Sequence, residues 1–186
     1  MFGATIAAIA IAAATSAPPT ELDASAAVVT AIATCEEWVL NPSSWVDGVT
    51  QFPAKTGLGS RGLVPQSSLP DVALPPPQFR RAMHHWRVPI GGGGVFVTTS
   101  DELPVCHLSG GGPFDLQPSV VKAQTSAEFL RHWNVVRTDV KGNLLTTYYQ
   151  SLRDPKLSLI LTRSSKAGDR TDRVQIVATA QYDTGK

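Results

Sequence analysis

The residues most suited to binding an anion are concentrated between positions 79 and 87. This stretch reads Phe-Arg-Arg-Ala-Met-His-His-Trp-Arg and contains Arg80, Arg81, His84 and Arg87. Guanidinium groups make paired hydrogen bonds with carboxylates and phosphates, and a nearby histidine adds positive charge below about pH 6.5. The apolar residues recur at helical spacing, so we expect a short amphipathic helix over residues 78–86. This helix either binds an anionic ligand or partner, or buries its apolar side while its charges face solvent.

His107 is a further candidate for a ligand contact, and its setting depends on the two cysteines. Adjacent residues of a strand point to opposite faces, so Cys106 and His107 cannot form a nucleophile–base pair there. Cys35 and Cys106 instead suit one disulfide in a small exported domain, with a reactive thiol as the alternative. By closing the loop between these two cysteines, the disulfide would contribute ~4 kcal/mol to the stability of the folded state in the chain-entropy estimate. We expect His107 on the face opposite the helices, in either a ligand-binding or a structural role.

Recognisable catalytic spacings are absent from the sequence. It contains no Gly-x-Ser-x-Gly, Cys-x-x-Cys or His-x-x-x-His, and its glycine runs lack the Lys and Ser/Thr of a phosphate-binding loop. We therefore expect no catalytic residues, metal or cofactor. Small exported enzymes can assemble such groups from distant strands, so a hydrolase acting on envelope material is the alternative.

Composition and charge limit the class of protein. The 186 residues are 42% hydrophobic, with 16 basic and 15 acidic side chains. This predicts one folded domain, and a net charge of +1 gives no electrostatic reason to expect nucleic acid as a partner. Residues 1–54 carry five acids and no bases. We expect this acidic segment to pack on the basic remainder, with an acidic arm for a partner as the alternative.

The first 17 residues are typical of a secretory signal peptide. They are uncharged, rich in Ala and Ile, and end in small residues before Pro18-Pro19. Cleavage after Ala14 or Ala17 fits this pattern, although a basic residue near Met1 is missing. A retained anchor and an ordinary apolar helix are the alternatives. We expect a periplasmic or secreted protein with a single domain over residues 18–186 and no stable membrane span after cleavage.

The elements expected along this domain follow from hydrophobic periodicity and turn residues. Val28, Ile32, Cys35 and Val39 form one stripe of a helix over residues 23–39, with Asp23 as its N-cap. Residues 41–77 form a long Pro/Gly/Ser-rich connection with at most one short strand, at 46–52. The later elements are a hairpin at 95–99 and 103–108, a helical region at 118–133, and strands at 145–152, 156–163 and 174–182. The helical region is either continuous or divided at residues 125–126.

Together these elements predict an α+β fold. We expect an antiparallel sheet of five to six strands, two to three helices packed on one face, and one disulfide from the first helix to the edge of the hairpin. A degenerate repeat of helix followed by strands is a further interpretation. For function we expect an exported, non-catalytic protein that binds a macromolecule or an anionic envelope component. Its contact surface is either the open face of the sheet or the basic stretch, with Arg80, Arg81, His84, Arg87 and His107 as candidates.

Overall fold

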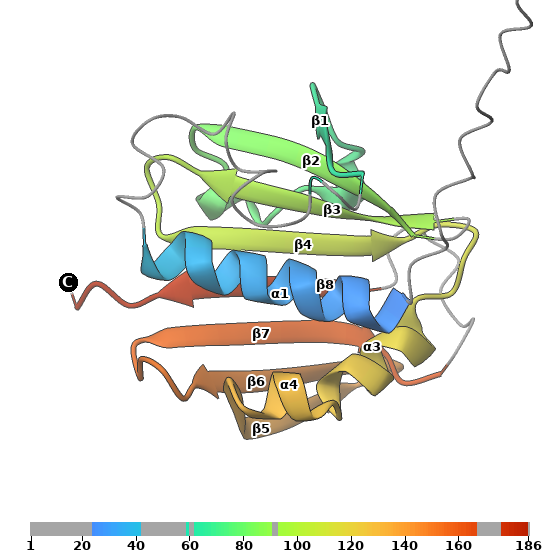
Figure 1. Ribbon diagram of the computed structural model, residues 1–186, viewed down its shortest axis with the longest axis vertical. Helices are drawn as coiled ribbons and strands as arrows, with labels where there is room; N and C mark the ends of the chain where they lie inside the picture. Colours follow the sequence, from blue (N-terminus) through green and yellow to red (C-terminus); the bar gives the residue numbers. More distant parts are fainter. Residues whose placement is uncertain (1–23, 42–58, 60–61, 91–92, 167–175, 186) are drawn as a thin grey trace, which may run out of the picture.

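The computed structural model describes residues 24–41, 59, 62–90, 93–166 and 176–185 (Figure 1). These residues form one antiparallel sheet of eight strands in the order β1-β2-β3-β4-β8-β7-β6-β5. The strands are β1 Val64–Gln66, β2 Met83–Ile90, β3 Gly93–Ser100, β4 Val105–Gly111, β5 Trp133–Lys141, β6 Leu144–Ser151, β7 Leu157–Ser164 and β8 Ile176–Tyr182. The α-helices are α1 Ala24–Leu40, α3 Gln117–Gln124 and α4 Ala127–Leu130, and two short 3₁₀ turns are η4 Asp71–Ala73 and η5 Pro77–Phe79.

The predicted sheet of five to six strands is wrong, because three strands lie outside the segments expected to form them. The hairpin β3–β4 and the strands β6, β7 and β8 are confirmed. Residues 78–86, expected to be a helix, contain the end of η5 and the start of β2. Trp86 fits helical spacing with Phe79 and Met83, but it also alternates with Val88 and Ile90. The second pattern prevails because β2 pairs with β3 over eight residues and buries Trp86.

The strand β5 escapes the sequence pattern for a different reason. Eight of its nine residues are exposed, so it has no apolar alternation to read. A register shift between Val135 and Arg137 in its pairing with β6 also breaks the period of two. The helical region before β5 is divided into two helices, which was one of the two predicted possibilities. The helix α3 ends at Gln124 and α4 begins at Ala127. Ser126 caps α4 by accepting a hydrogen bond from the Phe129 amide.

The topology consists of two similar halves. Each half has helix first and then a four-stranded antiparallel meander, β1 to β4 and β5 to β8, and the last strands β4 and β8 pair in the centre. This is the helix-plus-strands repeat that the sequence raised without any recurring motif. The arrangement places both edges of the sheet, β1 and β5, at the start of a half.

The helix α1 packs along the centre of one face, which we call the helix face (Figure 1). Its predicted stripe of Val28, Ile32, Cys35 and Val39 is at most 3% exposed. The predicted disulfide joins Cys35 to Cys106 of β4, with Cα atoms 5.2 Å apart. Because β4 pairs with β8 as well as β3, the bond reaches the middle of the sheet and not the edge that the sequence suggested. The Asp23 cap and the strand expected at 46–52 lie outside the described residues.

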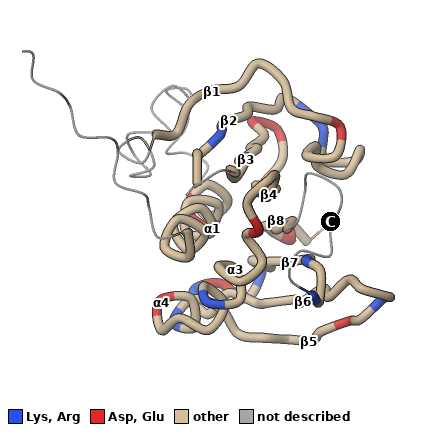
Figure 2. Tube along the Cα trace, turned by 90° about the vertical axis from the view of Figure 1, so that its right-hand side faces the viewer, with Lys and Arg blue, Asp and Glu red and all other residues tan. Residues whose placement is uncertain are grey.

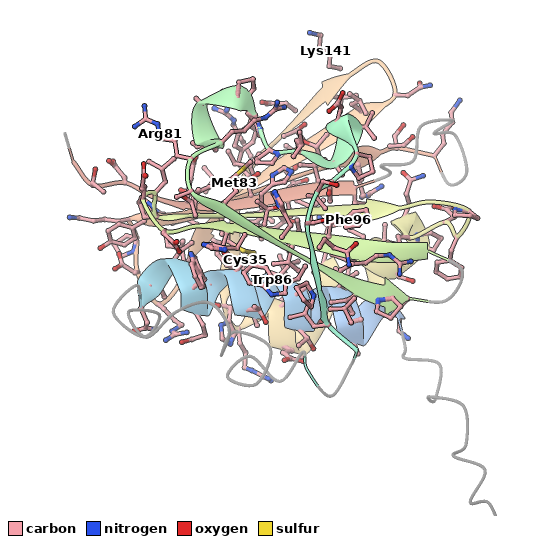
Figure 3. The ribbon with its side chains drawn as sticks, turned by 90° about the horizontal axis from the view of Figure 1, so that it is seen from above. Cys35, Arg81, Met83, Trp86, Phe96 and Lys141 are labelled. Carbon is pink, nitrogen blue, oxygen red and sulfur yellow. A yellow bond between two sulfur atoms is a disulfide. The ribbon has the colours of Figure 1, made fainter. Side chains whose placement is uncertain are left out.

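The opposite face, which we call the open face, is crossed by residues 67–82, the strap. Figure 2 shows this segment on the side of the sheet away from α1. Leu69, Ala73 and Leu74 pack with Phe96 of β3 and Val177 of β8, both open-face residues. Figure 3 shows the same division, with Trp86 toward α1 and Phe96 on the side of the strap. The open face therefore has one half covered by the strap, while its β7–β6–β5 half carries none of it.

Two of the five acids in the leading segment bind groups of the remainder, as the charge distribution predicted. The carboxylate of Glu36 is 1% exposed and lies 2.8 Å from Nδ1 of His132. Arg153 binds Glu37 and lies 3.6 Å from the second carboxylate oxygen of Glu36. These contacts join the C-terminal end of α1 to the second half of the sheet, and they place the buried Glu36 carboxylate beside the Arg153 guanidinium.

The glycines at the start of β3 allow close approach of strands, and this gives a first testable prediction. A Cβ on Gly93 would stand 2.4 Å from the carbonyl oxygen of Gly111, a backbone atom that cannot turn away. We expect Gly93→Ala to lower the free energy of unfolding by about 1–3 kcal/mol, the usual cost of overpacking. Gly94→Ala is the comparison with a smaller expected loss, because its closest contacts are 3.0 Å, one with the Val88 carbonyl oxygen and one with the movable Arg87 side chain. Equal urea midpoints for both variants and the wild type would refute the close approach.

Candidate functional site

The basic stretch does not form one anion-binding patch. Arg80 donates to the Pro75 carbonyl from the strap, while Arg81 is exposed and projects away from the sheet (Figure 3). His84 lies on the helix face beside Asp101, with 2.7 Å between His84 Nε2 and the carboxylate. Arg87 lies on the open face and donates to the Gly93 carbonyl. Because strand alternation separates these groups and backbone carbonyls occupy two of them, the four predicted residues do not converge on one ligand.

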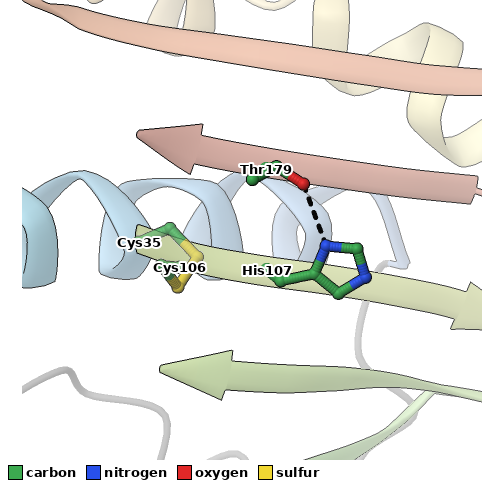
Figure 4. Close-up of a disulfide and its surroundings, with 4 residues drawn as sticks. All are labelled: Cys35, Cys106, His107 and Thr179. Carbon is green, nitrogen blue, oxygen red and sulfur yellow. Dashed lines mark hydrogen bonds between the residues drawn. A yellow bond between two sulfur atoms is a disulfide. The ribbon is translucent and has the colours of Figure 1, made fainter. Parts of the chain in front are cut away.

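His107 lies on the open face, as predicted, and belongs to a row of paired residues that crosses all eight strands. The row is Gln66, His85, Thr98, His107, Thr179, Ile160, Tyr148 and Arg137. Two imidazoles in this row bond the neighbouring hydroxyls, His85 to Thr98 at 3.0 Å and His107 to Thr179 at 2.9 Å (Figure 4). Register alone brings these residues together, so no local motif in the sequence marks them.

His107 is a structural histidine held neutral by burial. It is 3% exposed, and desolvation lowers its pKa to about 4. The strap covers it: the Ser109 hydroxyl donates to the Ala73 carbonyl at one end, and Phe79 lies near Val105 at the other. His107 lies between Ser109 and Val105 on the same strand face. It is therefore not placed to contact a ligand directly. Its neighbour on the same strand face, Val105, lines a hollow in the surface.

That hollow is the site that sequence reasoning missed. It has a volume of about 490 Å³ and lies at the end of the open face where β8 ends and β7 begins. Its lining comes from the end of the strap, the β3–β4 turn and the ends of β7 and β8: Phe79, Leu103, Pro104, Val105, Lys156, Ser158, Gln181, Tyr182, Asp183 and Thr184. These residues are spread over 106 positions of the chain, from 79 to 184, so only the fold assembles them.

The floor of the hollow continues into a polar strip along the same face. Val105 pairs with Gln181, which pairs with Ser158, and the row runs on through Gln150 to Asn134 of β5. Exposure increases along this row, from buried Val105 to exposed Gln150 and Asn134. An aromatic side chain at one end and a row of amide and hydroxyl groups beyond it can hold an extended chain that has both apolar and hydrogen-bonding groups.

The rim of the hollow is held by the C-terminal end of β8. The Tyr182 amide donates to the Pro104 carbonyl at 3.1 Å, and the Asp183 amide donates to the Lys156 carbonyl at 3.0 Å. The Tyr182 hydroxyl donates to Asp154 at 3.2 Å. These bonds fix the rim while Lys156 and Asp183 place one positive and one negative charge on it. The lining therefore has no net charge.

Neither a Ser-His-Asp triad nor a cluster of metal ligands is seen in the part of the chain that the structure describes. Each histidine there contacts either a hydroxyl or a carboxylate, and none joins the two as a hydrolase triad requires. No three His, Cys, Asp or Glu residues gather within the same described ranges. None of the described helices combines the length and apolar character that crossing a bilayer requires.

Comparison with known proteins assigns no relative to the chain. No protein-family model, no curated protein and no solved structure matches it.

Proposed function

We propose that this is an exported, non-catalytic binding protein and that the hollow beside Phe79 receives a segment of a partner protein. The observation that carries the proposal is the combination of Phe79 at the mouth with Gln181 and Ser158 on the floor. Phe79 is partly exposed on a short 3₁₀ turn, where it can pack against an apolar side chain. Amide and hydroxyl groups suit the donors and acceptors of a peptide backbone.

A protein segment is favoured over an anionic envelope component because of the charges. Lys156 and Asp183 offset each other on the rim. The cations that would have bound an anion, Arg80, Arg81 and Arg87, point to different surroundings or bond backbone carbonyls. A neutral amphipathic lining gives an anion no electrostatic advantage, whereas it serves an uncharged peptide segment well.

The location outside the cytoplasm is part of the same proposal. The Cys35–Cys106 disulfide is compatible with an oxidising compartment, since such bonds persist there and are rare in reducing ones. The leader-like residues 1–17 support export from the sequence side but lie outside the described residues. A partner would then be a secreted or envelope protein.

The proposal is tested by titrating the isotope-labelled, disulfide-bonded protein with a panel of short synthetic peptides and following backbone amide shifts. We expect binding peptides to shift the amides of Ser158, Gln181 and Lys156. Phe79→Ala and Gln181→Ala should each weaken binding by about tenfold, as loss of a central contact does. Shifts confined to the helix face would contradict the assigned site.

Two controls separate binding from folding and peptide from glycan. Gln66→Ala removes an amide from the same face at the far edge of the sheet, so it should leave the peptide affinity unchanged. Soluble glycan fragments are titrated in parallel. Saturable shifts at the hollow with glycans and none with peptides would replace the peptide proposal with a carbohydrate one.

A further inference from the structure

The strand β5 is an exposed sheet edge of unusual length. It runs for nine residues from Trp133 to Lys141, and within the described residues only β6 pairs with it. Val135, Val136 and Val140 are 50%, 61% and 68% exposed, so the edge carries an apolar surface besides backbone groups that no other described strand pairs with. Such an edge is a template for pairing with another strand.

The opposite edge of the sheet is closed to the same use. The strand β1 has three residues, and the middle one is Pro65, which has no backbone N–H to donate. Short length and proline are the usual protections of a sheet edge. The strand β5 has no proline. The features of this edge that can limit pairing with other strands are the register shift near Val136 and its charged side chains. The arrangement of those charges indicates what the edge accepts.

The sequence of β5 is complementary to itself when read in the antiparallel direction. Val136-Arg137-Thr138-Asp139-Val140 has an acid and a base at equal distances from Thr138. Within one chain Arg137 Nε lies 3.4 Å from the Asp139 carboxylate, and both side chains are more than half exposed. About a two-fold axis at Thr138, each Arg137 would stand opposite Asp139 of the second copy. Val136 would likewise stand opposite Val140.

We propose that two copies of this chain pair through antiparallel β5 edges centred on Thr138. Opposite charges placed directly across a strand pair stabilise it, and like charges destabilise it. An axis at Arg137 would oppose two arginines, and an axis at Asp139 would oppose two aspartates. The Thr138 register alone among these three matches every charge of Arg137 and Asp139 with its opposite. The pairing is independent of what the hollow binds, and it places both open faces on the same side of a continuous sheet.

Charge exchange on the full, disulfide-bonded chain tests the pairing by sedimentation velocity over a wide concentration range. We expect the wild type to dimerise. Asp139→Arg gives a strand with two arginines and Arg137→Asp a strand with two aspartates, so each variant alone should dimerise more weakly by roughly tenfold or more. An equal mixture of the two variants should regain the dimer, because each chain then meets the opposite charges.

Matched controls and clear contrary outcomes make the test decisive. Glu102→Arg and Arg81→Asp make the same changes of charge at exposed positions away from β5 and should leave the dimer intact. A wild type that stays monomeric at the highest concentration would overturn the proposal. Variants that dimerise like the wild type, or a mixture that fails to recover while both variants keep the wild-type far-UV spectrum, would overturn it equally.

Cysteine crosslinking tests the register itself. Residues directly opposite in an antiparallel pair have Cα atoms about 4.5–5.5 Å apart, within reach of a disulfide. Thr138→Cys should therefore crosslink to its own copy under mild oxidation. Val140→Cys is the control, because the two copies of residue 140 would be about 14 Å apart along the strands. Equal crosslinking of both variants would exclude the Thr138 axis.

Discussion

Removing the disulfide should lower the free energy of unfolding by about 4 kcal/mol, the chain-entropy value for cysteines 71 positions apart. The expected loss is large because a domain of this size has a total stability of only about 5–15 kcal/mol. Both cysteines are at most 1% exposed, between α1 and the central strand β4. Urea unfolding of Cys35→Ala/Cys106→Ala against the oxidised wild type measures the loss.

The reduced wild type is the control that separates the crosslink from packing. Reduction opens the loop while retaining both sulfur atoms, whereas the double alanine variant also removes them. We expect reduction to account for most of the loss and the alanine variant to lose somewhat more, because two buried sulfurs no longer fill the core. An oxidised protein no more stable than the reduced one would show that the bond does not constrain the unfolded chain.

The disulfide could be predicted because the chain has two cysteines and is expected to reach an oxidising compartment. The helix α1 could be predicted because its apolar residues form one stripe. Val28, Ile32, Cys35 and Val39 are consecutive contacts of one helix, so the sequence already contains their geometry. The confirmed strands β6 to β8 likewise alternate clearly. The helix and these strands are decided by neighbours in sequence, whereas the disulfide joins residues 71 positions apart and was predictable because the chain has only two cysteines to pair.

The predicted number of strands was wrong and the hollow was not predicted, because both depend on residues that are neighbours in space and not in sequence. Trp86 satisfies both a helical and a strand period, and only the presence of β3 beside it selects the strand. The exposed β5 buries almost nothing and owes its existence to the pairing with β6. Phe79, Lys156 and Gln181 approach one another only after β7 and β8 have met the end of the strap. The basic stretch was expected to form a helix with its charges on one surface. Its C-terminal half forms a strand instead, and strand alternation places His84 and Arg87 on opposite faces of the sheet.

Burial of His107 should make the protein markedly less stable as the pH falls from about 6.5 to 4. The imidazole has its ordinary pKa of 6.5 in the unfolded chain, whereas desolvation lowers the pKa to about 4 in the folded one. Between these values the unfolded chain takes up a proton that the folded chain refuses, so acid favours unfolding. The stabilising contribution is complete above pH 6.5 and is lost on the way down to pH 4. Over this window it amounts to about 3 kcal/mol.

His107→Asn isolates this contribution from the carboxylates that titrate in the same range. Asparagine places an amide near the position of Nδ1, so the hydrogen bond to Thr179 can persist without a titrating ring. From pH 7 to pH 4 the unfolding free energy of the wild type should fall by about 3 kcal/mol more than that of the variant. Nuclear magnetic resonance gives the direct measurement, because the His107 ring signals should titrate near pH 4. Titration near 6.5 would mean that water reaches the ring and that the strap does not seal the centre of the open face.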